Sequence, residues 1–98
     1  MSGTPAEEPS TRLEEIRAEI EALDRSLIEL IARRVELARH SGAAKQAAGL
    51  PTLDPAREAA VVRRACGTAR ELGLEDEDVR YIFWHLIGLA RRAQLTGE

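Results

Sequence analysis

An arginine interrupts the apolar face of the long helix that the first half of the sequence predicts. The apolar positions Leu27 and Leu30 are followed one helical turn later by Arg34, where the same spacing predicts another aliphatic side chain. Burying a guanidinium costs free energy unless an anion meets it. Arg34 therefore indicates either an anionic ligand or a structural role, in which it snorkels to water or pairs with a carboxylate such as Asp24 of another copy.

Further polar side chains fall on or beside the apolar faces of the predicted helices. Lys45 lies eleven residues after Arg34, close to three helical turns, so both side chains project from nearly one side of the helix. Glu58 shares a face with Val61. Gln94 continues an apolar stripe, where a buried amide needs a ligand or a water as partner. The full set of such residues is Arg17, Arg34, Lys45, Arg57, Glu58 and Gln94.

Each of these residues also has a structural explanation when it is taken alone. Arg17 and Lys45 fit a solvated surface, and Glu58 fits a carboxylate at the positive end of a helix dipole. Together they present cations, one carboxylate and one amide toward an apolar interior, which predicts a pocket for a small, doubly anionic ligand. We find no nucleophile paired with a base and no cluster of metal ligands in the sequence, so we expect neither metal nor cofactor.

Three helices are expected to position these residues, which makes the fold class all-α. The first helix has Ser10 or Thr11 as its N-cap and runs to about Ala48, before a Gly-Leu-Pro sequence at 49–51. The second helix has Asp54 as its N-cap and Pro55 at its first helical position. Residues 1–10 are expected to form a disordered tail, and residues 11–98 a single domain.

The second and third predicted helices each have an apolar inner face. Gly73 ends the second helix, and the acidic residues 75–78 suit the start of the third. The predicted inner face of the second helix is Glu58, Val61, Val62, Ala65, Ala69 and Leu72. That of the third is Val79, Ile82, Phe83, Leu86, Ile87, Ala90, Ala93 and Gln94.

The first helix is too long for one chain to cover. Its heptad-spaced apolar side chains, here called the apolar seam, are Leu13, Ile16, Ile20, Leu23, Leu27, Leu30 and Leu37. At 1.5 Å per residue the helix extends about 55 Å, and the two shorter helices cannot bury a seam of that length. We therefore expect an intertwined homodimeric helical bundle, in which two copies lie antiparallel along their seams.

The composition excludes several classes of protein. The net charge of −3 does not favour a nucleic-acid partner. No apolar run is long enough to span a membrane. The chain has one cysteine, Cys66, and its N-terminus is polar and acidic rather than like a signal peptide, so we expect a cytoplasmic protein with a reduced thiol.

The ordered set of residues resembles the all-helical (type II) chorismate mutases, over residues 12–95 without a gap. The matching positions in this sequence are Arg17, Ile20, Leu23, Asp24, Leu30, Ile31, Arg34, Lys45, Pro51, Asp54, Arg57, Glu58 and Gln94. The resemblance implies a homodimer that converts chorismate to prephenate by a Claisen [3,3] rearrangement, in the biosynthesis of Phe and Tyr. It implies no cofactor, because the rearrangement is unimolecular.

The resemblance also assigns roles to individual side chains. Arg17 reaches into the partner's site, Arg34 stays in its own, and the two bind the substrate carboxylates with help from Arg57. Lys45 and Gln94 donate hydrogen bonds to the ether oxygen of the breaking C–O bond.

The ring hydroxyl of the substrate is assigned to Glu58 and to the backbone at Asp54. Ala90 departs from the family pattern, which often has a small hydroxyl residue there, and we expect modestly weaker binding, since a neutral hydrogen bond contributes about 0.5–1.5 kcal/mol.

Three alternatives remain open from the sequence. A 4-amino-4-deoxychorismate mutase has the same fold and differs in how the ring substituent is held, on which Ala90 or Ser41 can report. An isochorismate-pyruvate lyase typically has an apolar residue at the position of Glu58, so Glu58 favours a mutase. The alternative of a different class is a non-enzymatic helical dimer that acts as an adaptor.

Overall fold

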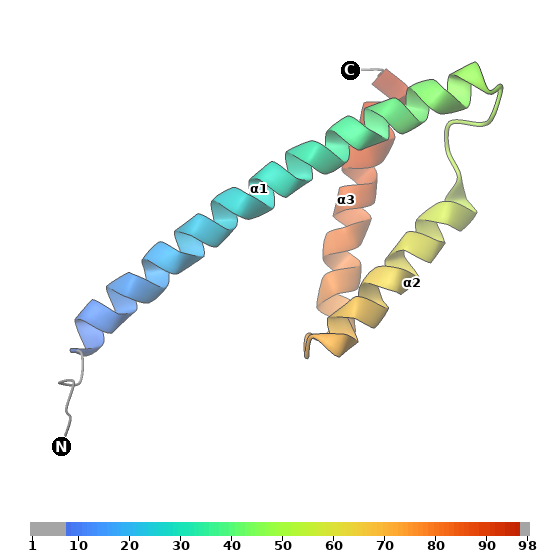
Figure 1. The fold of residues 1–98 in the computed structure, drawn as a ribbon. Coiled ribbons are helices and arrows are strands. Elements are labelled where there is room, and N and C mark those ends of the chain that lie inside the picture. The colour runs from blue at the N-terminus through green and yellow to red at the C-terminus, as the bar shows by residue number, and fades with distance from the viewer. Residues whose placement is uncertain (1–7, 97–98) are drawn as a thin grey trace. The chain divides into compact units, whose positions relative to one another are not determined.

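Three α-helices account for the fold of this chain (Figure 1). The computed structural model describes residues 8–96, and these contain no strand. Helix α1 spans Pro9–Ala47, α2 spans Pro55–Glu71 and α3 spans Asp76–Thr96. The all-α prediction is thus confirmed. The chain divides into two units, residues 1–31 and residues 32–98, and α2 packs against α3 within the second.

Helix α1 begins slightly earlier than the sequence predicts. Its first residue is Pro9, so Ser10 and Thr11 lie inside the first turn and the predicted N-cap is wrong. A proline suits the first position of a helix because its fixed φ is helical and its missing N–H needs no partner there. Of the predicted disordered tail, residues 1–7 lie outside the described residues, and Pro9 and Ser10 are helical.

Glycines end α1 and α2 as predicted. Gly49 and Gly73 have φ angles of 68° and 75°, in the left-handed region that glycine adopts without strain. After α1, Leu50 N–H donates to the Lys45 carbonyl at 2.9 Å. After α2, Leu74 N–H donates to the Ala69 carbonyl at 2.8 Å. Both are Schellman closures, which satisfy carbonyls at the helix end and stop the helix there.

The start of α2 also follows the prediction. The Asp54 carboxylate accepts a hydrogen bond of 3.0 Å from the backbone N–H of Arg57, and Pro55 is the first helical residue. This cap fixes the direction in which the chain enters α2, and with it the positions of the first-turn side chains of Arg57 and Glu58.

The core of the second unit is small and lies between α2 and α3. It consists of Val62, Cys66 and Ile87, with Val61 and Phe83 packed against it. The free thiol of Cys66 is buried, and Sγ donates to a backbone carbonyl 3.6 Å away. The predicted inner face of the second helix does not include Cys66.

Two predicted inner-face residues are exposed. Leu72 is 72% exposed because it is the C-cap beyond the last turn of α2, and Ile82 is 55% exposed. Two helices packed against each other bury only a narrow stripe of each, which is narrower than the apolar face that the sequence shows.

The apolar seam of α1 is not covered by the described residues of one chain. In the first unit, residues 8–31 form only helix, and Leu23 and Leu30 are 63% and 66% exposed. Most other seam residues are also exposed, namely Leu13, Ile20, Leu27 and Leu37. Within residues 8–96 no helix is long and apolar enough to cross a membrane.

Candidate functional site

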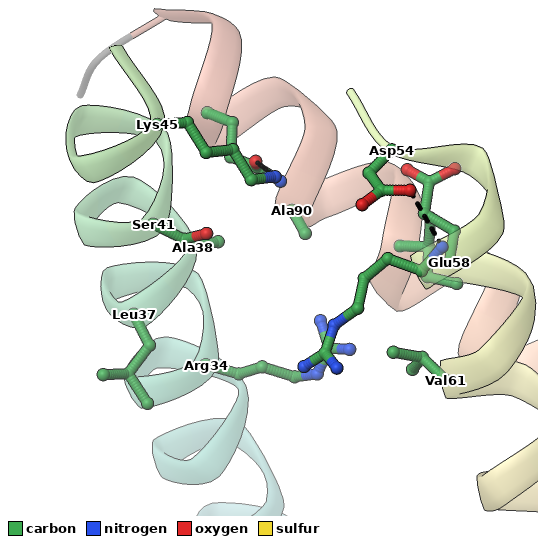
Figure 2. Close-up of a pocket in the computed structure, with 12 residues that line it drawn as sticks. Arg34, Leu37, Ala38, Ser41, Lys45, Asp54, Glu58, Val61 and Ala90 are labelled. Carbon is green, nitrogen blue, oxygen red and sulfur yellow. Dashed lines mark hydrogen bonds between the residues drawn. The ribbon is translucent and has the colours of Figure 1, made fainter. Parts of the chain in front are cut away.

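A cavity of about 340 Å³ lies within the second unit, where the end of α1 faces α2 and α3 (Figure 2). Six of the seven predicted site residues line it: Arg34, Lys45, Asp54, Arg57, Glu58 and Gln94. The seventh, Arg17, belongs to the first unit, where it is exposed on α1. The volume is within the range of small-molecule sites, about 300–1,000 Å³.

Lys45 and Gln94 meet at one end of the cavity. Lys45 Nζ donates to Gln94 Oε1 at 2.7 Å and to the Thr52 carbonyl at 2.8 Å. An ammonium can only donate, so the Gln94 atom that faces it is the oxygen, and the amide N–H groups stay available. Lys45 Nζ donates two hydrogen bonds among the described residues, so its third N–H remains available to a ligand. The pair therefore presents a cationic donor and a neutral donor side by side.

Gly42 allows the close approach of helices that places Gln94. It is the buried residue of α1, and a Cβ built on it lies 3.0 Å from Gln94 Cα and 3.2 Å from the Gln94 carbonyl oxygen. These are backbone atoms, so a methyl group there can be accommodated only if the two helices shift. No local pattern in the sequence predicts this role of Gly42.

We expect Gly42→Ala to lower the free energy of unfolding by about 1–3 kcal/mol, because overpacking forces backbone shifts. The matched control is Gly67→Ala in α2, where the nearest atom is the flexible end of Arg70, 4.0 Å away. That change removes a helix-interior glycine and is expected to stabilise by about 0.5–1 kcal/mol. Urea unfolding at one protein concentration measures both. Equal effects of the two substitutions would show that no close approach exists at Gly42.

Two arginines in the cavity have no carboxylate partner within residues 8–96. Arg34 extends from α1 into the cavity (Figure 2). Its Cζ lies 5.9 Å from the ring centroid of Phe83. Arg57 lines the cavity from the first turn of α2. None of the ion pairs among the described residues includes either guanidinium. Unpaired guanidinium groups beside one cavity suit an anionic ligand, which each can bind through two parallel hydrogen bonds.

Glu58 is held by Arg91, which is not among the predicted site residues. Arg91 Nε donates to Glu58 Oε2 at 2.8 Å, and Arg91 Nη2 donates to Oε1 at 2.5 Å. The two residues are 33 positions apart, so no local spacing rule joins them. One feature of the sequence places Arg91 near the site: it lies three residues before Gln94 on the same helix, so the two side chains are neighbours on the helix surface.

The environment of Glu58 keeps its carboxylate ionised. The hydrogen bonds from Arg91 lower its pKa below the ordinary 4.5, partial burial raises it, the positive charges of Arg91 and Lys45 lower it further, and Asp54 raises it. The net direction is downward. Glu58 is therefore an anionic hydrogen-bond acceptor at neutral pH and cannot serve as a proton donor.

We expect the contribution of Glu58 to stability to be lost at acid pH. A carboxylate whose pKa is lowered by folding stabilises the fold above its unfolded pKa, and this contribution decreases as the pH falls through the folded pKa. The difference in unfolding free energy between wild type and Glu58→Gln should thus be constant near neutral pH and should shrink below pH 4.5. A difference that stays constant down to pH 3 would contradict the ion pair.

The rest of the cavity wall is neutral. It includes the hydroxyl of Ser41 and the methyl group of Ala90 (Figure 2). No cluster of three metal-binding side chains occurs in the part of the chain that the structure describes. The arrangement can hold a small anion between fixed guanidinium groups and direct two donors at one oxygen of it.

The sequence matches a known family over most of its length. The family described as "Chorismate mutase type II" matches residues 16–95, which include all seven predicted site residues.

Two curated relatives are similar to parts of the chain. A T-protein of Haemophilus influenzae is 40% identical over 62 residues, which are 63% of this chain and 16% of that protein. A 4-amino-4-deoxychorismate mutase of Streptomyces venezuelae is 34% identical over 64 residues, which are 65% of this chain and 62% of that protein. The chain thus spans a small part of the first relative and less than two thirds of the second.

Proposed function

This chain belongs to the type II chorismate mutase family, and from that premise we propose that it catalyses the rearrangement of chorismate to prephenate. The observation that carries the proposal is the cavity that combines unpaired guanidinium groups with the Lys45–Gln94 pair. Chorismate has two carboxylates and an ether oxygen on which negative charge develops, so it needs these two kinds of group.

Binding is assigned to the arginines. The substrate must fold its enolpyruvyl side chain over its ring in a chair-like shape before the new C–C bond can form. Arg34 takes one carboxylate, Arg17 of a second copy takes the other, and Arg57 assists. Two fixed anchors remove the rotational freedom that makes the uncatalysed reaction slow.

The chemical step is assigned to Lys45 and Gln94. As the ether C–O bond breaks, negative charge grows on the ether oxygen, and no proton or electron needs to leave the substrate. The free N–H of the Lys45 ammonium and the Gln94 amide N–H groups stabilise this charge, and they are already in place because they hold each other at 2.7 Å. A compact ammonium suits a single oxygen better than a planar guanidinium does.

Glu58 and the backbone at Asp54 are assigned to the ring hydroxyl. An ionised carboxylate accepts a hydrogen bond from that hydroxyl, and the lowered pKa of Glu58 supports this role.

The proposal includes a homodimer in which each site takes Arg17 from the other copy. The exposed apolar seam of α1 supports it, because a second copy is a partner of matching length and chemistry. Sedimentation at micromolar concentration should therefore show a dimer, and a monomer would remove the role assigned to Arg17.

We further propose a cytoplasmic location and a place in the biosynthesis of Phe and Tyr. The buried, free thiol of Cys66 supports a reducing compartment.

The substrate is tested with three compounds: chorismate, 4-amino-4-deoxychorismate and isochorismate. Each is incubated with the purified protein, and its product is identified by chromatography and mass spectrometry. We expect prephenate from chorismate at the highest rate. Preferred turnover of the amino compound would favour the second candidate, which the 34% identity to the Streptomyces venezuelae enzyme supports. Release of pyruvate from isochorismate would indicate a lyase, and no turnover of any compound would favour an adaptor.

A further inference from the structure

The charges around the cavity are unevenly distributed. Arg34, Lys45 and Arg57 are cationic, and only Asp54 and Glu58 are anionic. The Asp54 carboxylate is engaged as the N-cap of α2. Of the two carboxylates among the described residues that line the cavity, Glu58 is therefore the one that does not cap a helix. A ligand group that faces Glu58 must donate a hydrogen bond to it.

Arg91 cancels the charge of this carboxylate. Its guanidinium meets both oxygens of Glu58, in the parallel geometry that forms the strongest pairs of this kind. Glu58 is only 13% exposed and Arg91 is 45% exposed, so the arginine covers the carboxylate from the solvent side. Each carboxylate oxygen has a second lone pair, which leaves Glu58 able to accept one more hydrogen bond.

The paired and the unpaired carboxylate would select different ligands. An isolated carboxylate attracts an ammonium group more strongly than a hydroxyl, because opposite charges attract across a dry site. Once Arg91 neutralises it, the carboxylate still accepts a hydrogen bond from a hydroxyl. An ammonium in the same place also meets the positive charge of Arg91, and such like-charge contact is unfavourable.

We propose that Arg91 is a specificity-determining residue, which makes the site prefer a substrate with a neutral hydroxyl facing Glu58 over one with an ammonium there. This inference rests on the proposed function and deepens it, since chorismate and 4-amino-4-deoxychorismate differ in this group. Arg91 acts through Glu58 and is not itself a catalytic residue.

The test compares kcat/KM for chorismate and for 4-amino-4-deoxychorismate in wild type and Arg91→Met. We expect the preference to shift toward the amino compound by about tenfold or more. The shift should appear mainly in KM, because the ring substituent carries similar charge in the ground and transition states. Arg91→Lys should retain most of the wild-type preference, since it keeps the charge. The matched control is Arg92→Met, an exposed neighbour on α3 that forms no ion pair among the described residues, and it should leave the preference unchanged.

The possible outcomes separate this inference from the proposed function. A parallel fall of kcat/KM for both compounds would mean that Arg91 only supports the fold, and would overturn the inference. An unchanged preference with chorismate turnover intact would overturn it as well and would leave the mutase function standing. A wild-type protein that prefers the amino compound contradicts it directly. If wild type accelerates neither compound, the proposed function fails and the inference fails with it.

Discussion

Replacing Lys45 by Met is expected to lower kcat for chorismate by about 10²–10³-fold, the usual effect of removing one donor that stabilises a developing oxyanion. Lys45 is hydrogen-bonded to Gln94 and Thr52, so its ammonium is fixed before the substrate arrives. The loss should appear in kcat more than in KM, because charge develops on the ether oxygen only in the transition state. Steady-state kinetics with each variant measures this division.

Two controls accompany this prediction. Lys45→Arg keeps the charge but replaces a compact ammonium by a planar group, and it should recover only part of the activity. Arg39→Met removes an exposed cation from the same helix, outside the cavity, and should leave kcat unchanged. Circular dichroism should show intact helices in all three variants. Full activity of Lys45→Met would contradict the proposed chemistry. If Lys45→Met is more stable than wild type and the wild type does not turn over chorismate, an adaptor would be favoured.

Arg34→Ala is expected to lower kcat/KM for chorismate by about 10²-fold or more, as for other charge pairs broken in a binding site. No carboxylate among the described residues pairs with Arg34, so its guanidinium is available for a substrate carboxylate. Arg17→Ala should have a comparable effect, because the proposal places Arg17 in the site of the other copy. Each variant alone should therefore be nearly inactive.

A mixture of these two variants distinguishes a site shared between copies from a site within one chain. In a dimer that contains one chain of each kind, one site has both arginines and the other has neither. Random exchange between chains should thus restore about a quarter of the wild-type activity, since the interface is two-fold symmetric. Mixing after mild denaturation and refolding provides the exchange. No recovery in dimers proven to be mixed would show that Arg17 serves its own chain or serves none.

The parts of the fold that depend on a few neighbouring residues could be predicted from the sequence. Asp54 and Pro55 predict the start of α2, and Gly49 and Gly73 predict the ends of α1 and α2, because capping and left-handed turns are local. Periodicity predicted that Arg34, Lys45, Glu58 and Gln94 lie on inward faces, and all four line one cavity. Asp54 and Arg57, which also line it, were assigned to the site by the resemblance. The roles of these residues came from the resemblance to a family and remain proposals.

The features that the sequence could not predict depend on contacts between distant segments. The Glu58–Arg91 ion pair joins residues 33 positions apart, and the contact of Gly42 with Gln94 joins α1 to α3. The exposure of Leu72 also differs from the prediction, because a helical periodicity does not show how much of an apolar face its neighbours cover.

The rate at which the purified wild-type chain consumes chorismate tests the central claim most directly. The loss of chorismate absorbance is followed at several protein concentrations beside a protein-free sample. We expect an initial rate proportional to protein concentration and far above the spontaneous rate, with prephenate as the product. A rate equal to that of the protein-free sample would contradict the claim that this cavity is a mutase site.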